Sequence, residues 1–77
     1  MKSVKVNINS IEKVKSLVNI VAQFEYDVDL ISGRYIIDAK SIMGVFSLDL
    51  SEPIELIIHS DSDCKDILSL LEPFIVK

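Results

Sequence analysis

The chain has few cysteines and histidines, which proteins use for disulfide cross-links and for zinc sites. Among its 77 residues it has one cysteine, one histidine, no tryptophan, two glycines and two prolines. The lone Cys64 cannot form an internal disulfide, and a free thiol fits a reducing compartment. One cysteine and one histidine do not supply the several ligands of a protein metal site. We therefore expect no disulfide framework, no metal and no cofactor.

Long hydrophobic runs and an excess of positive charge are also absent. No segment approaches the ~20 apolar residues of a membrane span, and the first five residues, Met-Lys-Ser-Val-Lys, lack the apolar run of a signal peptide. The formal net charge of −4 disfavours binding to a phosphate backbone. These features predict a cytoplasmic protein that binds neither membranes nor nucleic acids.

The apolar content of 49% is sufficient for one packed core, so we expect a single domain over residues 1–77. Apolar residues alternate over 4–8, which predicts a first strand. Asn9 is the expected N-cap of the next element, with Glu12 three residues later, and a helix is predicted from about Ser10 to Glu25. Its apolar residues at helical spacing are Ile11, Val14, Leu17, Val18, Val21, Ala22 and Phe24.

The rest of the chain predicts three further strands and two further helices. A hairpin should run from about residue 28 to 37, with a turn at Ser32-Gly33. Ser41 should cap a helix of about two turns, and a strand should cover 54–59 after a loop at 49–53. The last helix should follow the cap cluster 60–63, include Cys64 in its apolar stripe and end near Pro73, with 74–76 packed on the core. The predicted order is β-α-β-β-α-β-α, an α+β open-faced sandwich with a four-stranded antiparallel sheet and three helices on one face.

Residues 40–48 form the most specific motif of the chain. They read Lys-Ser-Ile-Met-Gly-Val-Phe-Ser-Leu. This run resembles the segment around the regulatory serine of HPr, the small phosphocarrier of the bacterial phosphoenolpyruvate-dependent sugar phosphotransferase system (PTS). One of its positions differs, because Phe46 stands where the family usually has Met. The order of elements is also that of HPr, so the resemblance covers the whole chain as architecture, while as a motif it is strong only from about Val28 to Leu50.

Ser41 admits a structural and a functional interpretation. As an N-cap its hydroxyl would accept a hydrogen bond from the helix backbone, whereas a phosphate on it would face free N–H groups, with Lys40 adjacent. A helix this short cannot bury all its apolar residues, so an exposed apolar patch suited to docking should lie beside Ser41. The resemblance implies that Ser41 is a target of the bifunctional HPr kinase/phosphorylase, with Ile42, Met43 and Phe46 as contact candidates. For Gly44 a packing role is the better interpretation.

The other half of the family signature is missing. HPr carries phosphate on the histidine of Gly-Ile-His-Ala-Arg-Pro near the start of its first helix, whereas residues 8–14 here read Ile-Asn-Ser-Ile-Glu-Lys-Val. Glu12 would repel an incoming phosphate, and Lys13 or Lys15 could replace the family's arginine only as a point charge. His59 is the one remaining candidate acceptor, expected on the face of the fourth strand opposite Leu56 and Ile58.

Three functions remain open from the sequence. The first is a non-catalytic regulatory or docking module that binds PTS-related proteins, namely HPr kinase/phosphorylase, with enzyme I or regulators as further candidates. The second is a PTS phosphocarrier with a non-standard acceptor. The third is an orphan interaction module on the HPr fold. An enzyme is disfavoured, because the sequence shows no paired carboxylates, phosphate-cradling glycine loop or nucleophile–base pair.

Overall fold

A computed structural model describes residues 1–76. The predicted order β-α-β-β-α-β-α is confirmed, with a short 3₁₀ helix added at the end. The elements are β1 (Lys2–Val6), α1 (Ile11–Ala22), β2 (Asp27–Ser32), β3 (Tyr35–Asp38), α2 (Ile42–Phe46), β4 (Ile54–His59), α3 (Lys65–Leu71) and η1 (Glu72–Phe74).

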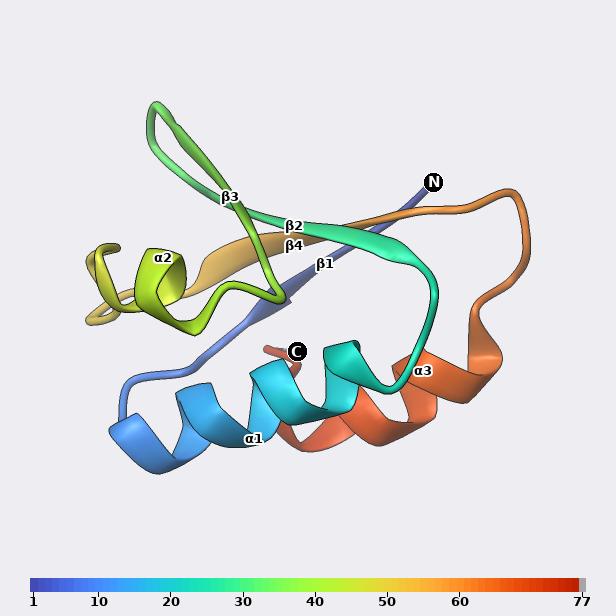
Figure 1. Ribbon diagram of the computed structural model, residues 1–77, viewed down its shortest axis with the longest axis horizontal. Coiled ribbons are helices and arrows are strands. Elements are labelled where there is room, and N and C mark those ends of the chain that lie inside the picture. Colours follow the sequence, from blue (N-terminus) through green and yellow to red (C-terminus); the bar gives the residue numbers. More distant parts are fainter. Residues whose placement is uncertain (77) are drawn as a thin grey trace.

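The four strands form one antiparallel sheet in the order β1-β4-β2-β3. Leu56 of the central strand β4 lies opposite Val4 of β1 on one side and Leu30 of β2 on the other. Figure 1 shows α1 and α3 beside each other against one face of the sheet, with α2 at one end of this layer. Successive side chains of a strand point to opposite faces, so alternate residues of each strand face the helices and the others face solvent.

The core lies between the sheet and the helices and is wholly apolar among residues 1–76. Its members from α1 are Val14, Leu17, Val18 and Val21. The assignment of Ile11 to this buried stripe was wrong, because Ile11 is the first residue of α1 and is 62% exposed. Ala22, the last residue of α1, is also exposed. Both residues lie at helix ends, beyond the turns that pack on the sheet.

The ends of α1 also differ from the prediction. Ser10, not Asn9, is the N-cap, and its Oγ accepts a hydrogen bond from the Lys13 N–H at 3.2 Å. The Asn9 side chain instead accepts from the Lys13 ammonium group at 3.2 Å. The helix ends at Ala22 and not at Glu25, because the chain turns there to enter β2 at Asp27.

The β2–β3 hairpin has a two-residue loop, Gly33-Arg34, closed by the opposed pair Ser32 and Tyr35. Gly33 has φ +59°, whereas the φ of Arg34 is not positive. Positive φ at the first central residue alone defines a type II′ turn, the turn that favours glycine there and matches the twist of paired strands. The glycine is therefore required by the backbone, since nothing lies within 4 Å of a Cβ built on it.

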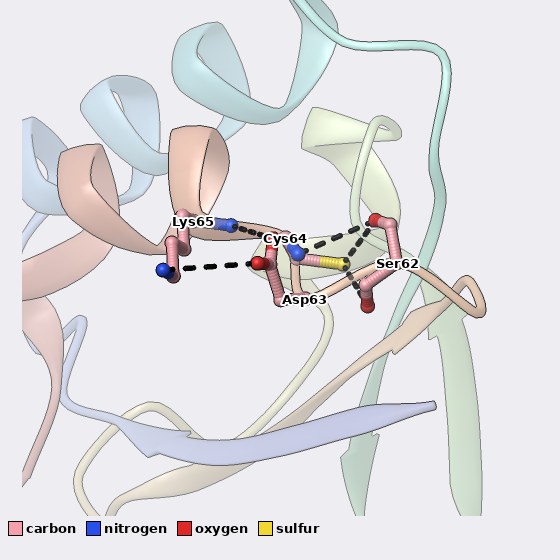
Figure 2. Close-up of polar contacts among 4 residues, drawn as sticks. All are labelled: Ser62, Asp63, Cys64 and Lys65. Carbon is pink, nitrogen blue, oxygen red and sulfur yellow. Dashed lines mark hydrogen bonds and ion pairs between the residues drawn. The ribbon is translucent and has the colours of Figure 1, made fainter.

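Cys64 lies just outside α3, at its N-cap, and not within the helix as predicted (Figure 2). It is 1% exposed and has φ 56°, a left-handed conformation that is unfavourable for residues with a Cβ. Its N–H donates to the Ser62 hydroxyl at 3.3 Å, and its carbonyl accepts from the Leu68 N–H at 2.9 Å. These bonds and the burial of its side chain hold the strained residue, which confirms it as a core residue.

The C-terminal tail packs as predicted. α3 ends at Leu71, and Pro73 lies in η1. Ile75 then pairs with Val6 on the edge of β1 that faces away from β4, and the Val76 N–H donates to the Lys5 carbonyl at 2.8 Å. The tail therefore covers the end of this sheet edge around Val6.

We expect the Cys64 thiol of the native protein to resist alkylation, because a side chain 1% exposed is reached only when the start of α3 opens. Iodoacetamide labelling followed by intact-mass measurement tests this, with protein in denaturant as the fast-reacting control. Labelling of native protein at the rate of the unfolded chain would contradict the burial.

Candidate functional site

Ser41 is the N-cap of α2, as predicted. Its backbone is extended, and its Oγ accepts a hydrogen bond from the Gly44 N–H at 3.3 Å. Its N–H donates to the Asp38 carbonyl at 3.0 Å, and its carbonyl accepts from Val45 at 2.9 Å. The residue is exposed, so its hydroxyl is held at the helix start while remaining accessible from solvent.

Lys40 lies beside Ser41 and is exposed. Its backbone N–H donates to the Asp38 carboxylate at 2.9 Å, which fixes the turn between β3 and α2. Beyond the other end of α2, Asp49 accepts hydrogen bonds from the hydroxyl and the N–H of Ser51, and these lower the pKa of its carboxyl. Short local bonds to carboxylates thus order the connection on each side of the helix.

The apolar residues of α2 divide into buried and exposed sets, as the sequence predicted. Val45 is fully buried, and Ile42 is partly buried against the core. Met43 is 78% exposed and Phe46 is 39% exposed. The helix is shorter than the two turns expected, since it covers only 42–46. The helix that Ser41 caps therefore presents two apolar side chains that the core does not bury.

Gly44 allows α2 to approach β3 closely. A Cβ at this position would lie 2.7 Å from the Ile37 Cγ2 and 3.2 Å from the Ser41 Oγ. The first distance is shorter than any carbon contact tolerates, and a β-branched side chain has little freedom to move. The structure thus supports the packing role predicted for Gly44.

The start of α1 lies at the same end of the molecule as α2, with which α1 is in contact (Figure 1). Asn9, Ser10, Glu12 and Lys13 are exposed there. The exposed Ile11 adds an apolar side chain to this end, a feature that sequence reasoning missed. The sequence feature that indicates this exposure is the position of Ile11 in the first turn, directly after the N-cap.

His59 lies far from the start of α1. It is opposite Asp27, which follows the end of α1, and a helix of 12 residues spans about 18 Å. Its Nε2 lies 2.9 Å from the Asp29 Oδ2, on the sheet face away from the helices. Leu56 and Ile58 are buried on the opposite face, as predicted.

A shallow cavity of about 520 Å³ lies beside His59. Its lining residues are Gln23, Phe24, Glu25, Tyr26, Asp27, His59 and Asp66. The rings of Phe24 and Tyr26 stack with centroids 5.9 Å apart, and the Tyr26 hydroxyl donates to Asp66 at 3.0 Å. The pKa of Tyr26 is raised: a side-chain interaction with Ser62 lowers it, but the bond to Asp66, burial and the Asp66 charge together outweigh that effect. This cavity and α2 lie toward opposite ends of α1 (Figure 1).

Two further features bear on the site. Within 1–76, no set of three or more His, Cys, Asp or Glu side chains is arranged to hold a metal ion. In the same range, no helix has the length and apolar character needed to cross a bilayer.

Comparison with protein families identifies the class. Residues 9–75 match the family model described as "PTS HPr component phosphorylation site". Because the match spans most of the chain, this protein belongs to the PTS HPr family, a phosphocarrier family that is not itself a family of enzymes. The match begins directly before the α1 N-cap Ser10, and the only histidine of the chain lies elsewhere, at His59. No curated protein matches this sequence significantly.

Solved structures agree on the fold. HPr-C-His from Thermoanaerobacter tengcongensis has a TM-score of 0.77 at 24% identity, over 95% of this chain and 89% of that protein. The phosphocarrier protein HPr from Bacillus anthracis str. Ames has a TM-score of 0.74 at 24% identity, over 97% and 94% of the two chains. A histidine-containing phosphocarrier protein from Mycoplasma has a TM-score of 0.70 at 14% identity, over 94% and 86%. The HPr-like open-faced sandwich is thus confirmed.

We expect Gly44→Ala to destabilise the protein by about 1–3 kcal/mol, because the added methyl overlaps the Ile37 side chain. Helix propensity alone would give the opposite sign, since alanine favours a helix interior by about 1 kcal/mol over glycine. Urea unfolding measures the difference. Met43→Ala, at an exposed position of the same helix, is the control and should change stability little. Stabilisation by Gly44→Ala would contradict the close contact.

Proposed function

We propose that this protein is a regulatory or docking module of the phosphotransferase system, modified at Ser41, and not a histidine phosphocarrier. The observation that carries the proposal is the exposed Ser41 hydroxyl at the N-cap of α2, with the exposed Met43 and Phe46 on the same helix. Membership of the PTS HPr family supplies the context, because members of this family interact with other PTS proteins.

The modification would be transfer of the γ-phosphoryl group of ATP to the Ser41 Oγ, with ADP as the leaving group and loss of the hydroxyl proton. HPr kinase/phosphorylase is the proposed catalyst. A phosphoserine carries about −1.5 to −2 charges and strong acceptor oxygens. At Ser41 these oxygens would lie near the N–H groups that open α2, where the Oγ already accepts from Gly44. The helix should therefore accommodate the phosphate without unfolding.

The proposed docking surface consists of Ile42, Met43 and Phe46. Met43 and Phe46 offer exposed apolar area, and Ile42 contributes its partly exposed edge. Methionine adapts to differently shaped partners, since its side chain is flexible and polarisable. A phosphate beside this surface would add charge to an apolar contact and so change which partners bind.

The lack of a carrier role is proposed from the start of α1. A relay through a phosphohistidine requires an exposed imidazole where cations and N–H groups stabilise the phosphate. Here Ser10 caps the helix, and Glu12 adds negative charge to its first turn. His59 is bonded to Asp29 at the far end of the sheet. The proposal includes a cytoplasmic location, where PTS partners of this kind would be met.

We expect HPr kinase/phosphorylase and ATP to add one phosphate to the wild-type protein and none to Ser41→Ala. Intact-mass measurement reads this directly. Ser47→Ala is the matched control, because Ser47 is an exposed serine at the other end of α2 and should leave the modification unchanged. Since Ser41→Ala removes a cap of about 1 kcal/mol, its folding is checked by circular dichroism. Absence of phosphate on wild type and Ser47→Ala alike would refute modification at Ser41.

We expect no acid-labile phosphate after incubation with phosphoenolpyruvate and enzyme I. The reason is that the start of α1 lacks an imidazole and His59 lies elsewhere. Transfer that disappears in His59→Gln would instead establish the non-standard phosphocarrier. An HPr with the family histidine, assayed in parallel, confirms that enzyme I is active.

A further inference from the structure

The two edges of the sheet differ. The edge of β1 is covered at its Val6 end, because Ile75 pairs with Val6 and the Asn7 N–H donates to the Phe74 carbonyl at 2.8 Å. At the other edge, β3 pairs only with β2 among residues 1–76. Figure 1 shows the β2–β3 hairpin projecting away from α1 and α3. An uncovered edge strand presents a row of backbone groups that can pair with another strand.

The direction of these backbone groups follows from the hairpin. In a two-residue hairpin the residues that flank the loop form a hydrogen-bonded pair, here Ser32 with Tyr35. Pairs alternate along an antiparallel ladder, so the N–H and C=O of Tyr35 and Ile37 face β2. Those of Ile36 face outward, together with the N–H of Asp38 and the carbonyl of Arg34. The open edge thus has a fixed hydrogen-bonding register.

This register is self-complementary. We infer that β3 pairs with β3 of a second copy of this chain, antiparallel and centred on Ile36. The Ile36 N–H of each copy then donates to the Ile36 carbonyl of the other, and the Asp38 N–H donates to the Arg34 carbonyl. The same symmetry places the cation Arg34 opposite the carboxylate of Asp38, twice per dimer. The Asp38 carbonyl already accepts from Ser41, so it is not needed for this pairing.

The charges on the sheet face away from the helices favour a cation beside Asp38. Asp38 lies directly opposite Asp29 on the neighbouring strand, and like charges so placed repel. Asp29 is bonded to His59 on one side, at 2.9 Å. Arg34 of the second copy would lie beside Asp38 on the open edge of β3, so that a cation flanks the two carboxylates on each side. Arg34 is the only arginine of the chain.

The apolar residue at the centre of this contact is also unused by the core. Ile36 is 66% exposed and lies on the sheet face away from the helices, beside the half-buried Ile31. In the pair its side chain would lie against that of the second copy and lose part of this exposure. A contact through one short strand buries far less than the ~1,200 Å² of a stable dimer, so association should be weak and concentration-dependent.

Analytical ultracentrifugation between about 10 µM and 1 mM tests the inference, a range chosen for weak affinity. The wild-type protein should shift from monomer towards dimer. Arg34→Glu turns both opposite-charge pairs into like-charge pairs and should weaken the dimer about tenfold or more. Asp38→Arg should do the same. A wild-type protein that stays monomeric over the whole range would overturn the inference.

Mixing the two variants gives the sharper result. In a mixed dimer the introduced carboxylate faces the introduced guanidinium, and the unchanged Asp38 of one chain faces the unchanged Arg34 of the other. The equimolar mixture should therefore regain the wild-type association that each variant lacks alone. Failure of the mixture to recover would overturn the proposed register.

A second pair of variants covers the case in which Asp38→Arg does not fold, since it removes the bond to Lys40. Ile36→Lys brings two ammonium groups together at the centre of the contact and should abolish the dimer. Met43→Lys, at a position on α2 that is even more exposed, should leave it intact. Loss of the dimer in Met43→Lys with retention in Ile36→Lys would place the contact on α2 and overturn the inference.

Discussion

The structure depends on β4, which pairs with β1 on one side and with β2 on the other. Its residues Ile54, Leu56 and Ile58 are buried and form the floor on which the helices pack. A slip of one residue in its register would turn these three side chains to solvent and bring Glu55 and His59 into the apolar layer. The alternation along β4 therefore fixes the sheet, the core and the composition of the outer face together.

The position of α2 follows from this arrangement and from the glycine at position 44, which has no side chain. β3 joins the sheet through β2, and its Ile37 faces the helix layer. Gly44 lets α2 settle onto Ile37, which brings Ser41 to the rim and turns Met43 outward. The exposure of Ser41 thus depends on a packing contact beneath it together with the hydrogen bonds of the turn that leads to it.

Much of the fold and part of the candidate site could be predicted from the sequence, because period-2 and helical patterns indicate which face of each element is buried. The order of the elements, the Ser41 cap and the presence of exposed apolar residues on α2 follow from such patterns, whereas only the structure shows that these are Met43 and Phe46. The errors lie at element ends. Ser10 and Asn9 are both good caps, and only the geometry shows which one the helix uses. The left-handed backbone of Cys64 is set by tertiary burial and leaves no trace in local composition.

The joining of β1 to the rest of the molecule has a consequence for how the chain folds during synthesis. β1 is the first strand, yet its partners are β4 and the segment around Ile75, which are the last strand and the tail. Until β4 and the tail have been synthesised, the earlier residues can form only local structures such as α1 and the β2–β3 hairpin. Contacts between distant parts of a chain close slowly. The nascent protein should therefore remain a collection of local elements until β4 is available, and the sheet should assemble late and in one cooperative step.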